Sequence, residues 1–320
     1  MSPRRMYVTQ ALAAVLVSGF VFFLASAVPA VRDLNVRGMD LFFRMRHAIQ
    51  NPPRDADQIV LVNIDDETLS RLEARWPYPR SIYAEVLGHL KPHRPKAIGF
   101  DLIFSGKDLS PAGDPLFAQA LRETGNVVLA AHRDAQGEVR PSPILGESVW
   151  RVGLVDKPRD PDGVVRRTFP VSSAGGKEQN SWELELLETA FSRPEIRDPT
   201  LRSDLVINYR LRFHQFQTVS FWRLLEGSVP AAEIRNKIVL IGLTAEVFHD
   251  VYATPLGLMP GLAINANTLL MLMRGDMFSM PPSWAVPVLT LASIWLALVL
   301  AASSPVLVGA AVILLVSVCY

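Results

Sequence analysis

Three aspartates follow apolar segments that are typical of buried strands. Asp65 comes directly after residues 59–64, Asp101 after residues 97–100, and Asp250 a short loop after residues 237–242. Ligands of parallel sheets bind beyond the carboxyl ends of the strands, so these acids occupy positions where a site is expected. Together they could hold a hard cation such as Mg²⁺ or Ca²⁺, or the hydroxyl groups of a polar ligand. The alternative, which we weigh above it, is that they cap a helix and end strands.

Two further side chains could serve the same site. Arg80 ends a segment in which Pro77 and Pro79 fix the backbone, so this segment is either an aromatic lid over a ligand or a stiff connector to the next helix. His249 stands beside Asp250, where it could titrate near neutral pH or be an ordinary surface histidine. The candidate ligand-binding residues are therefore Asp65, Asp101, Asp250, Arg80 and His249. The sequence leaves open whether a metal joins them.

Signatures of catalysis are missing from these 320 residues. There is no GxSxG elbow, no HExxH motif and no P-loop. His89 and His93 are spaced as metal ligands could be, but Pro95 follows them and predicts a solvated helix end. We therefore predict no catalytic residue and no cofactor. The alternative is an exported metal-dependent hydrolase that uses Asp65, Asp101 and Asp250.

An alternation of strand and helix patterns must position the candidate residues. Apolar β-branched runs predict strands, and runs with apolar residues on one helical face predict helices. In chain order we expect a strand at 59–64, a helix at 81–90, a strand at 97–100, a helix at 115–124 and a strand at 127–131. Strands that alternate with helices pair in parallel through right-handed crossovers. This predicts an α/β fold whose mainly parallel sheet is flanked by helices.

The middle of the chain has a different pattern. Residues 152–155 and 164–169 flank the turn signal Asp160-Pro161-Asp162-Gly163, which predicts an antiparallel β extension. Further elements are expected as a helix at 182–191, a strand at 205–209, a short helix at 219–225, a strand at 237–242 and a helix at 262–274. Asn265 and Asn267 lie near the start of that last helix, where we expect them to serve its first turn.

Three uncharged apolar runs predict membrane anchoring. Residues 7–28 are long enough for the roughly 20 residues that span a bilayer, and residues 284–302 and 306–320 predict a transmembrane hairpin. Arg4 and Arg5 place residues 1–6 in the cytoplasm by the positive-inside tendency, and residues 31–280 on the other side. A cleavable signal peptide is the alternative for the first run, and it would export the same region. The last run is truncated at Tyr320, so we expect a longer protein.

The net charge and the cysteine content exclude one class of partner and one kind of cross-link. The net charge of +1 lacks the basic excess of nucleic-acid-binding proteins, so we expect no nucleic acid partner. The one cysteine, Cys319, lies in the last apolar run, so the exported region cannot form an internal disulfide.

Several motifs follow one another over most of the exported region. They span residues 33–275 and comprise residues 40–46 (DLFFRMR), IVLVNIDDETL, WPYPR, AIGFDLIF, Asp114 before a helix, DPDGVVRR, KIVLIGLTAE, HDVYATPLG and PGLAINANTLL. Because the ordered set is far more specific than any one motif, the chain resembles the CHASE2 family over nearly all of its exported region.

The resemblance implies the sensory input region of a bacterial transmembrane receptor. In that family an extracytoplasmic domain follows one N-terminal membrane helix, and further helices lead to a cytoplasmic cyclase, diguanylate cyclase or kinase, which this chain lacks. It implies a multi-pass protein of the inner (plasma) membrane with a periplasmic or extracellular main domain. Signalling between chains predicts a homodimer, and the expected partner is an unknown small-molecule or envelope signal.

Overall fold

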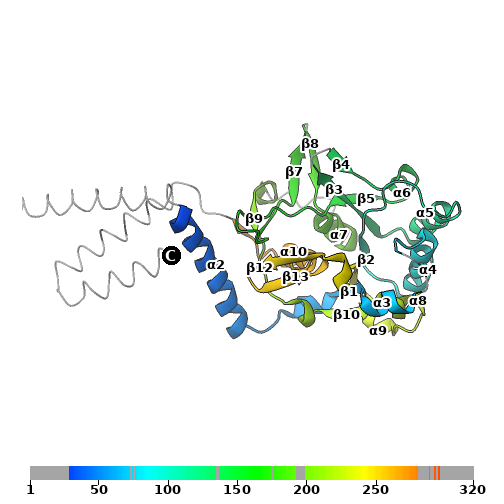
Figure 1. The fold of residues 1–320 in the computed structure, drawn as a ribbon, viewed down its shortest axis with the longest axis horizontal. Helices are drawn as coiled ribbons and strands as arrows, with labels where there is room; N and C mark the ends of the chain where they lie inside the picture. The colour runs from blue at the N-terminus through cyan, green and yellow to red at the C-terminus, as the bar shows by residue number, and fades with distance from the viewer. Residues whose placement is uncertain are drawn as a thin grey trace, which may run out of the picture. The chain divides into compact units, whose positions relative to one another are not determined.

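The computed structural model describes residues 29–279, apart from 73, 75, 135, 136, 175 and 192–198, together with 288, 292 and 295 (Figure 1). The predicted membrane runs at 7–28, 284–302 and 306–320 lie outside the described residues, except for those three isolated positions. Within the described part of the chain, no helix combines the length and apolarity that a membrane span requires.

The chain divides into two compact units, residues 1–46 with 280–320 and residues 47–279. Apart from the three isolated positions, the described part of the first unit is most of helix α2 (Pro29–Ile49), which follows the first apolar run. The second unit holds the sheet and the candidate residues.

A mainly parallel sheet organises the second unit. Its strands are β10 (Gln217–Ser220), β1 (Ile59–Ile64), β11 (Ile238–Leu243), β2 (Ala97–Asp101), β3 (Val127–Asp134), β4 (Gly137–Val139) and β5 (Arg151–Leu154). The order is β10-β1-β11-β2-β3-β4, and β5 also pairs with β3. Every pair is parallel except β3 with β4. The central strands are apolar and buried throughout because helices cover both faces.

Alternate residues along the strands pack against two helical layers. Val60, Val62 and Ile64 share a core with α4 (Arg80–Leu90), α5 (Gly113–Thr124) and α8 (Phe221–Leu225). On the other face, α7 (Trp182–Phe191) and α10 (Gly261–Arg274) contact the sheet and each other. Gly99 lets α7 approach closely, since a Cβ atom there would lie 2.4 Å from the Trp182 ring.

The remaining elements are short. The helices are α3 (Asp66–Arg71), α6 (Pro143–Gly146) and α9 (Ala231–Ile234). Antiparallel pairs form three small sheets from β6 (Arg167–Thr168), β9 (Leu205–Val206) and β14 (Phe278–Ser279), from β7 (Val171–Ala174) and β8 (Lys177–Asn180), and from β12 (Val251–Thr254) and β13 (Gly257–Pro260).

The antiparallel extension predicted around the DPDG turn forms only in part: Arg159 and Val165 make an antiparallel bridge across the turn, but the two flanking strands do not pair with each other. The turn itself forms, with Gly163 N donating to Asp160 O at 2.8 Å. However, β5 adds in parallel to β3, and β6 pairs with β9. A turn motif determines only the local reversal of the chain. The apolar segment that precedes the turn pairs instead with the free edge of β3, as strand β5.

The predicted helix at 219–225 is also wrong at its start. Residues up to Ser220 form β10, which pairs in parallel with β1, and the helix begins only at Phe221. The β-branched pair Thr218-Val219 suits a strand beside β1, so pairing at the sheet edge overrides helical continuation.

Candidate functional site

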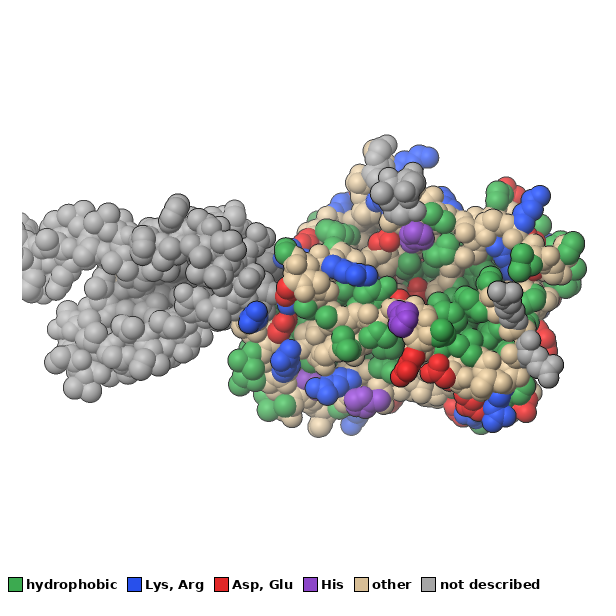
Figure 2. Space-filling view, viewed as in Figure 1, with side chains coloured by type: hydrophobic (Ala, Val, Ile, Leu, Met, Phe, Trp, Pro, Cys, Tyr) green, Lys and Arg blue, Asp and Glu red, His purple; other side chains and the backbone are tan. Residues whose placement is uncertain are grey.

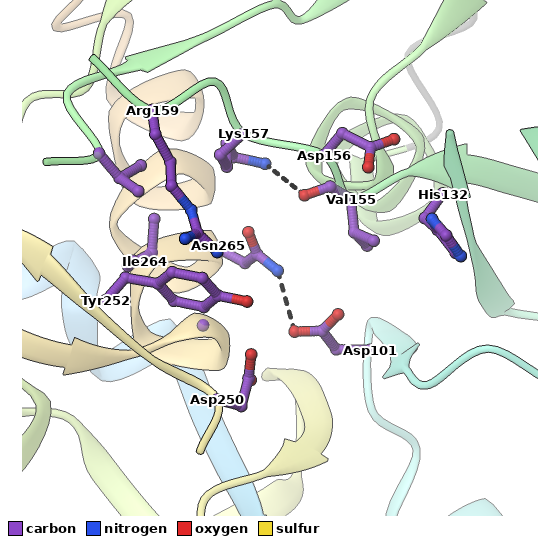
Figure 3. Close-up of a pocket in the computed structure, with 12 residues that line it drawn as sticks. Asp101, His132, Val155, Asp156, Lys157, Arg159, Asp250, Tyr252, Ile264 and Asn265 are labelled. Atoms are coloured by element: carbon purple, nitrogen blue, oxygen red, sulfur yellow. Dashed lines mark hydrogen bonds between the residues drawn. The ribbon is translucent and has the colours of Figure 1, made fainter. Parts of the chain in front are cut away.

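A cavity of about 320 Å³ lies beyond the carboxyl ends of β2, β3 and β5 (Figure 3). Its lining mixes both charge signs with amide, phenol and imidazole groups. The lining residues are Asp101, His132, Val155, Asp156, Lys157, Arg159, Val165, Asp250, Tyr252, Gly261, Ile264 and Asn265. The position agrees with the general rule for ligand sites in parallel sheets. On the face drawn in Figure 2, acidic and basic side chains are interspersed.

Asp101 reaches the cavity because it is the last residue of β2. Asn265, on the first turns of α10, donates from Nδ2 to Asp101 Oδ2 at 2.9 Å. The amide therefore orients one carboxylate and lines the same cavity, instead of serving only its own helix as we expected from the sequence.

Asp250 enters from the segment between β11 and β12. The tight start of α10 lies against it, since a Cβ atom on Gly261 would be 2.7 Å from Asp250 Oδ2. The Tyr252 hydroxyl hydrogen-bonds the Asp250 carboxylate. In Figure 3, the Asp101 carboxylate, the Asp250 carboxylate and the Tyr252 hydroxyl converge on one space.

The two carboxylates are electrostatically costly. Burial raises the pKa of Asp101 to about 7, and the negative charge of Asp250 adds to the rise, whereas Lys157 and the Asn265 hydrogen bond oppose it. Burial also raises the pKa of Asp250, against the hydrogen bond from Tyr252. Asp101 is therefore close to half-protonated near pH 7, and a cation that joined the two carboxylates would favour the ionised form of both.

The two cations of the cavity differ in how they are paired. Lys157 Nζ lies 2.7 Å from Glu183 Oε1, and both side chains are almost fully buried, at 7% and 0% exposure. Arg159 is exposed, with its guanidinium 4.7 Å from the centre of the Tyr252 ring. The charge of Lys157 is thus neutralised by Glu183 within the cavity wall, whereas Arg159 makes no ion pair with a described carboxylate.

Asp65 does not join the other two aspartates. It caps α3, accepting from Thr68 N at 2.8 Å, from Thr68 Oγ1 at 2.6 Å and from Ser220 Oγ at 3.0 Å. Strand β11 lies between β1 and β2, which separates Asp65 from Asp101 by roughly 10 Å, two strand spacings. The predicted trio is therefore not assembled, and the hydrolase alternative loses the arrangement on which it depended.

Among the residues that the structure describes, no group of three or more His, Cys, Asp and Glu side chains could hold a metal ion. The cavity combines the converging carboxylates of Asp101 and Asp250, and that of Asp156, with hydrogen-bonding groups and a guanidinium. It is thus suited to binding a polar or charged molecule by hydrogen bonds and charge complementarity.

Arg80 lies in a separate polar cluster. Its side chain is 7% exposed and pairs with the Asp114 carboxylate. Its Nη2 atom donates to the carbonyl oxygens of Ser105 at 2.8 Å and Gly106 at 3.2 Å, and its backbone N–H donates to Asp108 Oδ2 at 3.0 Å. The WPYPR segment therefore acts as the stiff connector of the two sequence-based alternatives, with Arg80 as its buried clamp.

His249 is exposed and does not line the cavity. Its backbone has φ of 51° and ends a short 3₁₀ turn, donating to Glu246 O at 3.1 Å. Its neighbour Asp250, one residue further on, is the group that faces the cavity.

Sequence reasoning missed five polar lining residues: Asp156, Lys157, Arg159, Tyr252 and His132. The first three lie in the irregular segment after β5, and His132 lies on β3 beyond its pairing with β2. Only Tyr252 had a usable signal, since it stands two residues after a candidate acid and shares its side of the chain wherever that segment is extended.

Comparison with protein families identifies the chain. The CHASE2 domain family matches residues 12–308, which is most of the sequence. A comparison with curated proteins finds no match, and a comparison with solved structures finds none either. CHASE2 domains are extracytoplasmic sensor domains and are not catalytic. The family match, the parallel α/β fold and the polar cavity agree, and the chain belongs to the CHASE2 domain family.

Proposed function

We propose that this chain is the sensory input region of a bacterial transmembrane receptor, and that its signal binds in the cavity of Asp101 and Asp250. The receptor lies in the inner (plasma) membrane with a periplasmic or extracellular main domain. It controls a cytoplasmic cyclase, diguanylate cyclase or kinase domain that is not among these 320 residues.

The convergence of two half-buried carboxylates on one open space carries this proposal. Holding like charges together in a partly desolvated wall costs stability, and such arrangements gather at functional sites. The rest of the chain offsets little of this cost, because Asp101 and Asp250 each accept few hydrogen bonds. A ligand that supplies positive charge or hydrogen-bond donors would relieve the cost.

Transmission requires two states of the domain that the signal binds unequally. The coupling elements in this proposal are α2, which follows the apolar run at 7–28, and the segment 274–282, which precedes the run at 284–302. Coupling between two copies of the chain across the membrane favours a homodimer. A small-molecule or envelope signal is the partner.

A ligand screen on residues 1–320 in lipid nanodiscs tests the proposal. Binding to the native state raises the melting temperature in proportion to RT ln(1 + [L]/Kd). We expect at least one compound from a library of small polar metabolites to stabilise the wild-type chain and to stabilise Asp101→Asn or Asp250→Asn much less. Arg71→Met is the control, because the Arg71 side chain is 54% exposed, forms its ion pair with the exposed Glu67 on its own helix and lies over the Trp222 ring, away from the cavity lining. If every stabilising compound acts equally on both cavity variants, the signal does not bind in this cavity.

A further inference from the structure

The chemistry of the cavity narrows the class of signal. We infer that the cavity binds a small molecule of the amino acid class, with its ammonium between Asp101 and Asp250 and its carboxylate at Arg159. This inference rests on the proposed function, since it assigns the ligand of the same site.

The acidic end of the cavity is matched to a primary ammonium. The carboxylates of Asp101 and Asp250 converge with the Tyr252 hydroxyl, so acceptor oxygens from three side chains surround one space (Figure 3). A primary ammonium has three N–H donors, which can be directed to those three groups. Its positive charge would offset the repulsion between the two acids.

A buried amide supports a ligand in the same place. Asn265 is 4% exposed and lines the cavity. Its Nδ2 atom is used on Asp101, whereas its Oδ1 atom accepts no hydrogen bond from the described residues. Because this oxygen is open to the cavity and not fully buried, it can accept a hydrogen bond from a ligand N–H or from water.

The complementary charge lies beside the acids, on the other side of Tyr252. Arg159 holds its guanidinium against the Tyr252 ring and hydrogen-bonds this side chain, and its fork of donors is suited to a carboxylate. Lys157 contributes less, because Glu183 neutralises it within the wall. An ammonium and a neighbouring carboxylate on one molecule would therefore meet both charges at once.

Size and ligand chemistry separate this class from others. A volume of about 320 Å³ is at the small end for ligand pockets and fits a molecule of amino acid size. A divalent cation would have only the two converging carboxylates of Asp101 and Asp250, since the described residues contain no group of three or more acids, histidines or cysteines that could hold a metal ion. An inorganic ion would also leave Arg159 without a role.

Binding of defined probes to residues 1–320 in nanodiscs tests the inference. The probes are the twenty standard L-amino acids, each at millimolar concentration, and for any that binds, its decarboxylated amine and its deaminated acid. We expect at least one amino acid to bind in calorimetry, with both truncated probes about tenfold weaker or worse, as the loss of one charge contact implies. Asp101→Asn and Asp250→Asn should abolish binding of the amine, and Arg159→Met should weaken the amino acid while leaving the amine unchanged.

The outcomes separate the inference from the proposed function. If no amino acid binds, but Ca²⁺, Mg²⁺ or a neutral polyol binds and requires Asp101, the ligand class is wrong and the sensing cavity stands. If an amino acid binds equally to wild type and both aspartate variants, the ammonium position is wrong. If nothing in the full library depends on Asp101 or Asp250, both the inference and the proposed function are overturned. Folding of each variant is checked by its unfolding transition.

Discussion

Two buried polar clusters stand near the carboxyl end of β2, and they differ in how well their charges are satisfied. In the Arg80 cluster, the guanidinium pairs with Asp114 and binds two carbonyl oxygens, and Asp108 accepts backbone N–H groups from Arg80 and Leu109. In the cavity, burial and then the charge of Asp250 raise the pKa of Asp101 to about 7, against a single hydrogen bond from an amide.

The difference separates scaffold from site. A polar group whose hydrogen bonds are all made within the chain has no donor or acceptor free for a ligand, and it makes the fold more specific. A group that is short of partners weakens the fold and can be relieved from outside. Both Arg80 and Asp101 were candidate ligand-binding residues from sequence, and only their partners distinguish them.

The largest expected effect is on the Arg80 cluster. Arg80→Met removes the guanidinium and leaves the Asp114 carboxylate without its partner, which should cost about 3–5 kcal/mol of unfolding free energy. Denaturant unfolding of the chain in nanodiscs measures it. The matched control is Arg71→Met, where an exposed pair is worth at most about 1 kcal/mol. Similar losses in the two variants would remove the distinction between a clamp and a surface pair.

The substitution Asp101→Asn is expected to raise the free energy of unfolding instead of lowering it. Asp101 has a folded-state pKa of about 7 against an ordinary value of 3.8, so the native state holds the proton more tightly. Stability from this group is complete below pH 4 and is lost as pH rises through 7. A shift of about three units at about 1.4 kcal/mol each gives a loss of up to about 4 kcal/mol. Asparagine cannot ionise, so the variant should gain stability over wild type between pH 4 and pH 8, measured by unfolding at each pH. If the difference in unfolding free energy between the variant and wild type were the same at every pH in that range, the charge of Asp101 would not be the source of the cost.

A smaller loss is expected at Asp65, which belongs on the scaffold side of the comparison. Asp65→Ala removes the cap of α3 and should cost about 0.5–2 kcal/mol, whereas Asp65→Asn should keep most of the cap. Thermal unfolding measures both. Neither change should alter ligand binding, so a Kd that worsened in Asp65→Asn would return Asp65 to the site.

The smallest effect on stability is expected at Gly261, whose lack of a side chain lets the Asp250 carboxylate lie against the start of α10. In Gly261→Ala the new Cβ atom would meet Asp250 Oδ2 at 2.7 Å, so the carboxylate must move. Because a flexible side chain yields, we expect a stability change below about 1 kcal/mol but about tenfold weaker ligand binding. Gly88→Ala in α4 is the control, since nothing lies within 4 Å of its Cβ position. It should stabilise the chain by about 0.5–1 kcal/mol and leave binding unchanged.

Local patterns in the sequence predicted the elements that build the sheet. The β-branched runs at 59–64 and 238–242 became β1 and β11, and the amphipathic run at 182–191 became α7. The errors fell where pairing at a sheet edge decided the outcome, at β5 and β10. Periodicity reports which residues of a segment face a core, but it does not report which neighbour supplies that core.

The sequence by itself determined the family, the parallel α/β class and the place of the acids at the carboxyl ends of strands. Only the tertiary structure decided which acids meet. Because β11 lies between β1 and β2, Asp65 is kept away from Asp101, and the return of the chain after β11 brings Asp250 in its place. The partners of Arg80 and Lys157 come from segments 34 and 26 residues further along the chain, so their pairing followed from packing and not from local spacing.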